Sequence, residues 1–167
     1  MAYTLEEFAA DIRAALTADP GPAGREEVRR LVERALADED FLAAYLPPDA
    51  DAERRVLYED PELGFCICAH AYTGPKRGQP HDHGPTWAVY GQAAGETEMT
   101  DWRIVEPPQG DRPGTVARTR TYMLRPGEAH LYEPGDVHAP LRDGPTRLIR
   151  IQGRNTDRIE RTKLEAV

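Results

Sequence analysis

Three histidines in this sequence have a spacing that suits metal chemistry. His81 and His83 flank Asp82, and residues two apart in a β-strand project from the same face, so both imidazoles can reach one ion. Much further along the chain, His138 closely follows a Pro134-Gly135 turn. A lone histidine is more often a core or surface residue than a ligand. The combination, in a chain of short strands, predicts one divalent metal held by His81, His83 and His138.

The donor set limits the chemistry without choosing the metal. Three neutral imidazoles leave the charge of a divalent ion uncompensated and leave coordination positions open for a substrate. Iron, zinc, nickel and copper all accept such ligands. The residues alone therefore predict a reactive metal site of unspecified metal.

The surrounding residues predict a mainly β chain that begins with helices. A capping box at Thr4 and Glu7 opens one helix, and apolar spacing predicts a second from about Arg25 to Tyr45. From Arg54 onward, short β-prone runs alternate with Gly/Pro turns, as in a sandwich or barrel. The expected strands are Arg55–Glu59, Phe65–Tyr72, Trp87–Gln92, Glu98–Ile104, Thr115–Leu124, His130–Tyr132 and Thr146–Gln152.

Length and composition favour one domain and exclude several partners. The chain has 167 residues, which suits one core: a helical segment at 1–50 packed on a barrel at 51–155, with a tail at 156–167. A net charge of −8 disfavours nucleic acid and anionic membranes. No apolar run reaches the roughly 18 residues of a membrane span, and no secretory signal opens the chain. We expect a cytoplasmic monomer or homodimer that binds a small molecule.

The first histidine pair belongs to a motif that resembles the cupin superfamily. That motif has the form G-x5-HxH-x3,4-E-x6-G, and here His81 and His83 are followed by Ala88 at the glutamate position and by Gly95. The second cupin motif is matched by Gly127, Gly135 and His138, with Pro134 one place late and Arg142 replacing the usual asparagine. The resemblance implies a double-stranded β-helix, or jelly-roll barrel, preceded by two or three helices. It also favours His138 over His130 as third ligand, leaving His130 a structural or rim residue.

The stretch PHDHGPTWAVYGQAAGETEMTDWR at residues 80–103 is similar to the metal-binding segment of cysteine-dioxygenase-type thiol dioxygenases. Those enzymes also replace the cupin glutamate and hold iron(II) on three histidines. The resemblance, extending over residues 1 to about 155, implies an Fe(II) cofactor, with Zn, Ni or another divalent metal as alternatives. It further implies O₂ and a thiol as substrates and a sulfinate as product. The cysteine that is crosslinked in some relatives would stand at Ala88, so no such crosslink is expected.

The substrate-holding residues of that branch are replaced here. Its early arginine has its nearest match in Tyr58-Glu59-Asp60, and its Ser-x-His-x-Tyr series corresponds to Leu148–Gln152. Either Arg150 faces the interior and binds an anionic group, or Ile149 and Ile151 face inward and Arg150 lies on the surface. Both readings stay open. The candidate substrate contacts are Arg150, Gln152, His70, Tyr72, Tyr58 and Trp87; no catalytic residue is assigned beyond the metal ligands.

Three functions follow from these observations. The first is an Fe(II) dioxygenase acting on a small molecule, most simply a thiol. The second is a cupin metalloenzyme of other chemistry, such as dioxygenation or isomerisation of a carbon substrate, which the replaced substrate residues favour. The third is a non-enzymatic cupin that binds a small molecule or a metal.

Overall fold

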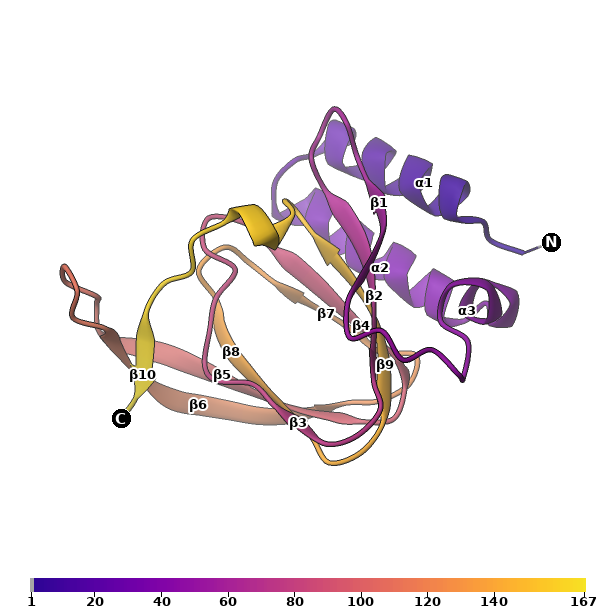
Figure 1. Cartoon of the computed structure of the whole chain (residues 1–167). Helices are drawn as coiled ribbons and strands as arrows, with labels where there is room; N and C mark the ends of the chain where they lie inside the picture. Colours follow the sequence, from indigo (N-terminus) through magenta and orange to yellow (C-terminus); the bar gives the residue numbers. More distant parts are fainter. Residues whose placement is uncertain (1) are drawn as a thin grey trace.

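The computed structural model describes residues 2–167, so Met1, at the start of the predicted helical segment, lies outside it (Figure 1). Among the described residues, the chain opens with the α-helices α1 (Leu5–Ala18), α2 (Pro22–Leu36) and α3 (Glu39–Tyr45). The predicted capping box is present: the Thr4 hydroxyl accepts a hydrogen bond from the Glu7 amide, and the Glu7 carboxylate accepts one from the Thr4 amide. These two bonds satisfy backbone amides that would otherwise have no hydrogen-bond acceptor at the start of α1.

The single second helix predicted from Arg25 to Tyr45 is wrong, because the chain breaks between α2 and α3. Asp38 sits at the break with an extended backbone, and its Oδ1 accepts a hydrogen bond of 3.0 Å from the Phe41 amide. Its Oδ2 accepts a second, of 2.7 Å, from the Tyr3 amide. Aspartate is a favoured N-cap, so this residue ends the apolar periodicity of α2 and starts a new helix.

Two five-stranded sheets follow the helices and form the walls of an open half-barrel (Figure 1). Sheet A has the order β1 (Arg55–Glu59), β2 (Cys66–Tyr72), β9 (Thr146–Gln152), β4 (Ala88–Ala94) and β7 (Ala129–Tyr132). Sheet B has the order β10 (Leu164–Ala166), β6 (Gly114–Leu124), β5 (Thr97–Glu106), β8 (Val137–Arg142) and β3 (Lys76–Arg77). The chain changes sheet after almost every strand, which is the winding of a jelly roll. The predicted mainly β, cupin-type double-stranded β-helix with N-terminal helices is therefore confirmed.

Several strands of sheet B were not predicted from the sequence. Strand β8 contains Pro140, whose missing amide weakens any strand signal, yet β8 lies between β5 and β3. The segment predicted as a tail also carries structure: β10 pairs in parallel with β6, Leu164 opposite Gly114. The end of the chain thus crosses to sheet B.

The helices cover the outer face of sheet A, and this decides which way its strands point. Val89, Ile149 and Ile151 are fully buried in one apolar cluster with α1 and α2 residues such as Phe8 and Val28. The alternate residues of the same strands therefore face the interior between the sheets. None of the helices in the described part of the chain is long and apolar enough to span a membrane.

A buried carboxylate ties α1 to the loop after β1. The Asp60 side chain has no exposed surface; it accepts hydrogen bonds from Arg13 Nε at 2.9 Å, the Tyr58 hydroxyl at 2.7 Å and the Leu63 amide at 2.7 Å. Burial alone would raise the pKa of Asp60, but the Leu63 amide, Tyr58 and Arg13 outweigh it and lower the pKa to about 2.

This lowered pKa predicts a pH-dependent contribution to stability. A carboxyl whose pKa falls on folding stabilises the protein above its ordinary pKa near 4, and the effect disappears as pH falls towards 2. We expect Asp60→Asn to lower the free energy of unfolding at pH 7 by roughly 1–2 kcal/mol. The lower value applies if solvent screens the interaction with Arg13, whose side chain is partly exposed. Urea unfolding of both proteins between pH 7 and pH 3 should show the difference shrinking, whereas the exposed Asp111→Asn should follow wild type throughout. A difference constant with pH would contradict the assignment.

Candidate metal centre

The backbone itself brings two of the predicted ligands together. His81 and His138 form an isolated antiparallel bridge, with amide-to-carbonyl distances of 3.0 and 2.9 Å in the two directions. His83 lies in the loop that follows, so the two histidines do not share one face of a regular strand. The bridge to β8, rather than alternation along one strand, brings His81 next to His138. One ligand nitrogen from each of the three histidines lies within 4.8 Å of the others.

The spacing of the His83 and His138 nitrogens fits a bound metal. Nε2 of His83 and Nε2 of His138 are 3.3 Å apart, and two nitrogens bound at about 2.0–2.1 Å to a shared ion lie roughly 3–3.4 Å apart. His81 donates from Nδ1 to the Gln79 carbonyl at 2.7 Å, which leaves Nε2 free to bind. The donor set therefore fits the predicted ion.

The surroundings keep these imidazoles neutral. Burial, reinforced by Arg150, lowers the pKa of His83 to about 2. Burial also lowers the pKa of His81 to about 4 and that of His138 well below its ordinary value. The neutral imidazole is the form that donates a lone pair to a metal.

Tyr90 lies beside the histidines and was not predicted from the sequence as part of the site. Its hydroxyl lies 2.9 Å from Nε2 of His83 and 3.1 Å from Nε2 of His138. Tyr90 follows Ala88 by two residues in β4, so it shares the interior face with the position of the absent cupin glutamate. That alternation was the available signal. The Arg150 guanidinium lies 4.0 Å from the centre of the Tyr90 ring, close enough for a cation–π contact.

Four of the six predicted substrate contacts face the interior of the barrel. Arg150 pairs with Cys68 across β2 and β9, and the open question of its direction is settled: Ile149 and Ile151 point to the helices and Arg150 points inward. Gln152 is buried, with its Oε1 3.7 Å from the Cys66 sulfur. His70 is buried, donates from Nδ1 to a backbone carbonyl at 2.7 Å and stacks on Tyr72.

The structure corrects the assignment of the other two, Tyr58 and Trp87. Both pack on the helix side of sheet A, in the cluster that contains Phe8 and Val28. The Tyr58 hydroxyl is bonded to Asp60 rather than directed at the histidines. Each residue lies one strand position out of phase with the interior-facing residues, so neither reaches the metal centre.

His130, the alternative third ligand, is not part of the histidine cluster of the described residues. Its ring stacks on Tyr122 at a centroid distance of 5.0 Å and lies 4.6 Å from the ring of Tyr132. His130 therefore packs against two tyrosine rings, which agrees with its prediction as a structural or rim residue.

A cavity of about 310 Å³ opens beside the centre. Its wall includes His81 from the cluster and Arg150 from sheet A, so the cavity reaches the three-histidine group at His81. The described lining residues contain four cationic side chains and no carboxylate; they are Tyr72, Lys76, Gly78, Gln79, His81, Pro140, Arg142, Arg150 and Arg161.

Comparison with known proteins finds similar solved structures but no matching family model or curated sequence. Among solved structures, an uncharacterised protein with a double-stranded β-helix domain from Klebsiella pneumoniae is 16% identical, covering 74% of this chain and 94% of its own (TM-score 0.48). KdgF from Halomonas sp. is 15% identical over 64% and 82% (TM-score 0.47), and the Cnp3 cupin domain of Schizosaccharomyces pombe is 11% identical over 65% and 72% (TM-score 0.48).

The class of protein is therefore defined by the chain's own architecture. Its strand order is that of a cupin-type jelly roll, and its interior carries a three-histidine group that could hold a metal ion. The structural neighbours give no support specific to the cysteine-dioxygenase branch.

Proposed function

We propose that this protein is a mononuclear non-haem iron(II) oxygenase that converts a small thiol to its sulfinic acid. The observation that carries the proposal is the three-histidine group without a carboxylate ligand, set beside a cationic cavity. Neutral ligands leave the ion's charge uncompensated, which favours an anionic thiolate as a further ligand. The reaction balances as RSH + O₂ → RSO₂H, with sulfur oxidised by four electrons and both oxygen atoms retained.

The chain's own residues would orient the reactants. Iron(II) bound to His81, His83 and His138 would supply the binding of thiolate and O₂ and the electron transfer between them. Arg150 offers a guanidinium to an anionic group of the substrate. Full burial of His138 excludes bulk water from the inner end of the site.

Tyr90 supports the thiol version of the proposal. The last strand lacks the tyrosine that organises the site in cysteine-dioxygenase-type enzymes. Tyr90 supplies a phenol from β4 instead, within hydrogen-bond distance of His83 and His138. Its proton is placed to be donated to, or accepted from, a group bound beside these two histidines.

Oxygen uptake by iron-loaded protein tests the proposal. The protein is loaded anaerobically with one equivalent of Fe(II) and mixed with O₂ and a thiol panel of cysteamine, cysteine, 3-mercaptopropionate and mercaptosuccinate. We expect uptake of one O₂ per thiol with at least one of these, and a sulfinate by mass spectrometry. Full iron loading without uptake for any thiol would contradict it.

The replaced substrate residues favour a second candidate, a metalloenzyme acting on a carbon substrate. Tyr58, which stands near the position of the missing early arginine, faces the helices rather than the cavity. Product analysis under ¹⁸O₂ separates the two: label on carbon, or a product without label, supports the second candidate.

A further inference from the structure

Arg142 is a buried cation whose charge is not compensated. The residue is 2% exposed, and its Nε and Nη2 have no hydrogen-bond partner among the described residues. Its guanidinium lies 4.6 Å from the centre of the Tyr72 ring, a contact that neutralises no charge. A guanidinium stays protonated in proteins, and a buried charge without a partner is costly. The position therefore calls for an anion.

Arg150 repeats this arrangement on the opposite wall. Within the described part of the chain its Nε is also buried without a hydrogen-bond partner, and its guanidinium lies 4.0 Å from the centre of the Tyr90 ring. Arg142 comes from β8 of sheet B and Arg150 from β9 of sheet A, and both line the cavity that reaches His81. Two uncompensated guanidiniums thus enter one cavity from two sheets.

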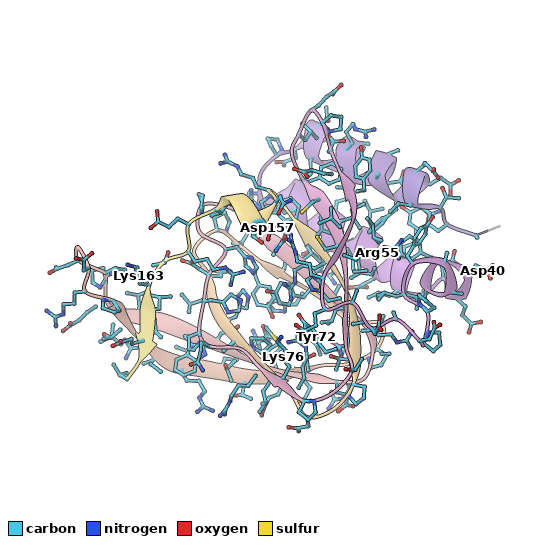
Figure 2. All side chains as sticks on the ribbon, in the orientation of Figure 1. Asp40, Arg55, Tyr72, Lys76, Asp157 and Lys163 are labelled. Carbon is cyan, nitrogen blue, oxygen red and sulfur yellow. The ribbon has the colours of Figure 1, made fainter. Side chains whose placement is uncertain are left out.

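The other charges around the cavity leave this excess in place. Lys76 Nζ is paired with Glu53 at 2.6 Å. It also lies 5.3 Å from the centre of the Tyr72 ring, and Figure 2 labels these two neighbouring residues. Arg161, on the segment that crosses to sheet B, adds an exposed cation at the wall. The chain as a whole carries −8, so the cavity is a local positive site on an acidic protein and concentrates anions.

We infer that this cavity binds a small dianion, a dicarboxylate or a phosphate, through Arg142 and Arg150. A monoanion would leave one guanidinium unpaired, whereas two carboxylates or one phosphate satisfy both, with bidentate geometry available to each arginine. Binding of the dianion does not depend on the proposed function. Its role as the substrate of the metal centre does rest on that function. Within that function it selects thiols that carry two further negative charges.

Calorimetric titration of metal-stripped protein tests the dianion site without any turnover. We expect succinate or inorganic phosphate to bind at least tenfold more tightly than acetate at low ionic strength, and the stronger of the two identifies the anion type. Arg142→Met and Arg150→Met should each weaken that binding at least tenfold. The matched control Arg118→Met removes an exposed arginine on β6 and should bind as wild type does.

Thermal unfolding separates a binding role from a structural one. Since Arg142 is uncompensated without ligand, Arg142→Met should melt at or above the wild-type temperature in anion-free buffer and lose the upward shift that the dianion gives wild type. Equal binding of acetate and the dianions, or wild-type binding by Arg142→Met, would overturn the inference. If one variant fails to fold, the other variant and the wild-type selectivity still decide. Dianion binding without oxygen uptake would defeat only the proposed oxygenase activity.

Discussion

Replacing His83 or His138 by alanine is expected to weaken metal binding at least about 100-fold. Removal of even an outer-sphere partner costs 10–100-fold in affinity, and each of these residues supplies one of only three ligand nitrogens. Wild-type protein should retain close to one Fe(II), Co(II) or Zn(II) per chain after anaerobic dialysis. Each variant should retain less than about a tenth of an equivalent. Elemental analysis and titration with Co(II), followed by its absorption spectrum, measure both quantities.

His130→Ala provides the matched control for this loss. His130 lies against Tyr122 and Tyr132 outside the three-histidine group, so its removal should leave the metal content at the wild-type level. Tyr90→Phe removes the hydroxyl beside two ligand nitrogens but no nitrogen, and we expect at most a tenfold weaker affinity. Metal retained by His83→Ala but lost from His130→Ala would move the site away from the proposed centre.

The grouping of His81, His83 and His138 could be predicted from the sequence, because the spacing of the first pair and the cupin-like turn before His138 carry the information. The route by which the ligands meet could not, because it depends on the bridge between His81 and His138, a pairing between distant segments. The roles of Tyr90 and Arg142 were missed for a similar reason. Each is an unexceptional residue in its own strand, and only the closing of the two sheets brings one to the histidines and the other into the cavity.

The direction of Arg150 shows the limit of hydrophobic patterning. The apolar pattern alone favours Ile149 and Ile151 in the barrel interior, which would place Arg150 on the surface. Sheet A instead has an apolar outer face, because the helices cover it, and a polar inner face that carries the site. Alternation identifies two faces but not which of them is inside when both are buried. The helix break at Asp38 depends on a local cap that apolar spacing does not reveal. The strand that contains Pro140 depends on pairing with distant strands.

The second large effect is expected at the helix layer: Phe8→Ala should destabilise the protein by about 3–5 kcal/mol. Phe8 is fully buried, with its ring 5.5 Å from that of Phe41 in an edge-to-face contact and 5.7 Å from that of Tyr3. Typical domains have a total stability of about 5–15 kcal/mol, so the loss is a large fraction of it. Urea unfolding measures the change, and Leu63→Ala, at a side chain 43% exposed, should stay within about 0.5 kcal/mol of wild type.

The same variant tests whether helices and barrel fold as one domain. Undocking the helices would expose Val89, Ile149 and Ile151 on the outer face of sheet A, and the half-barrel offers no other cover for them in the described chain. Far-ultraviolet dichroism and the near-ultraviolet signal of the buried Trp87 should therefore lose amplitude in one coincident transition. Two separate transitions would show an independent helical unit. Because the histidines lie in the interior between the sheets, away from the helix-covered outer face of sheet A, the folded variant should still bind metal as wild type does. This result separates loss of the scaffold from loss of the site.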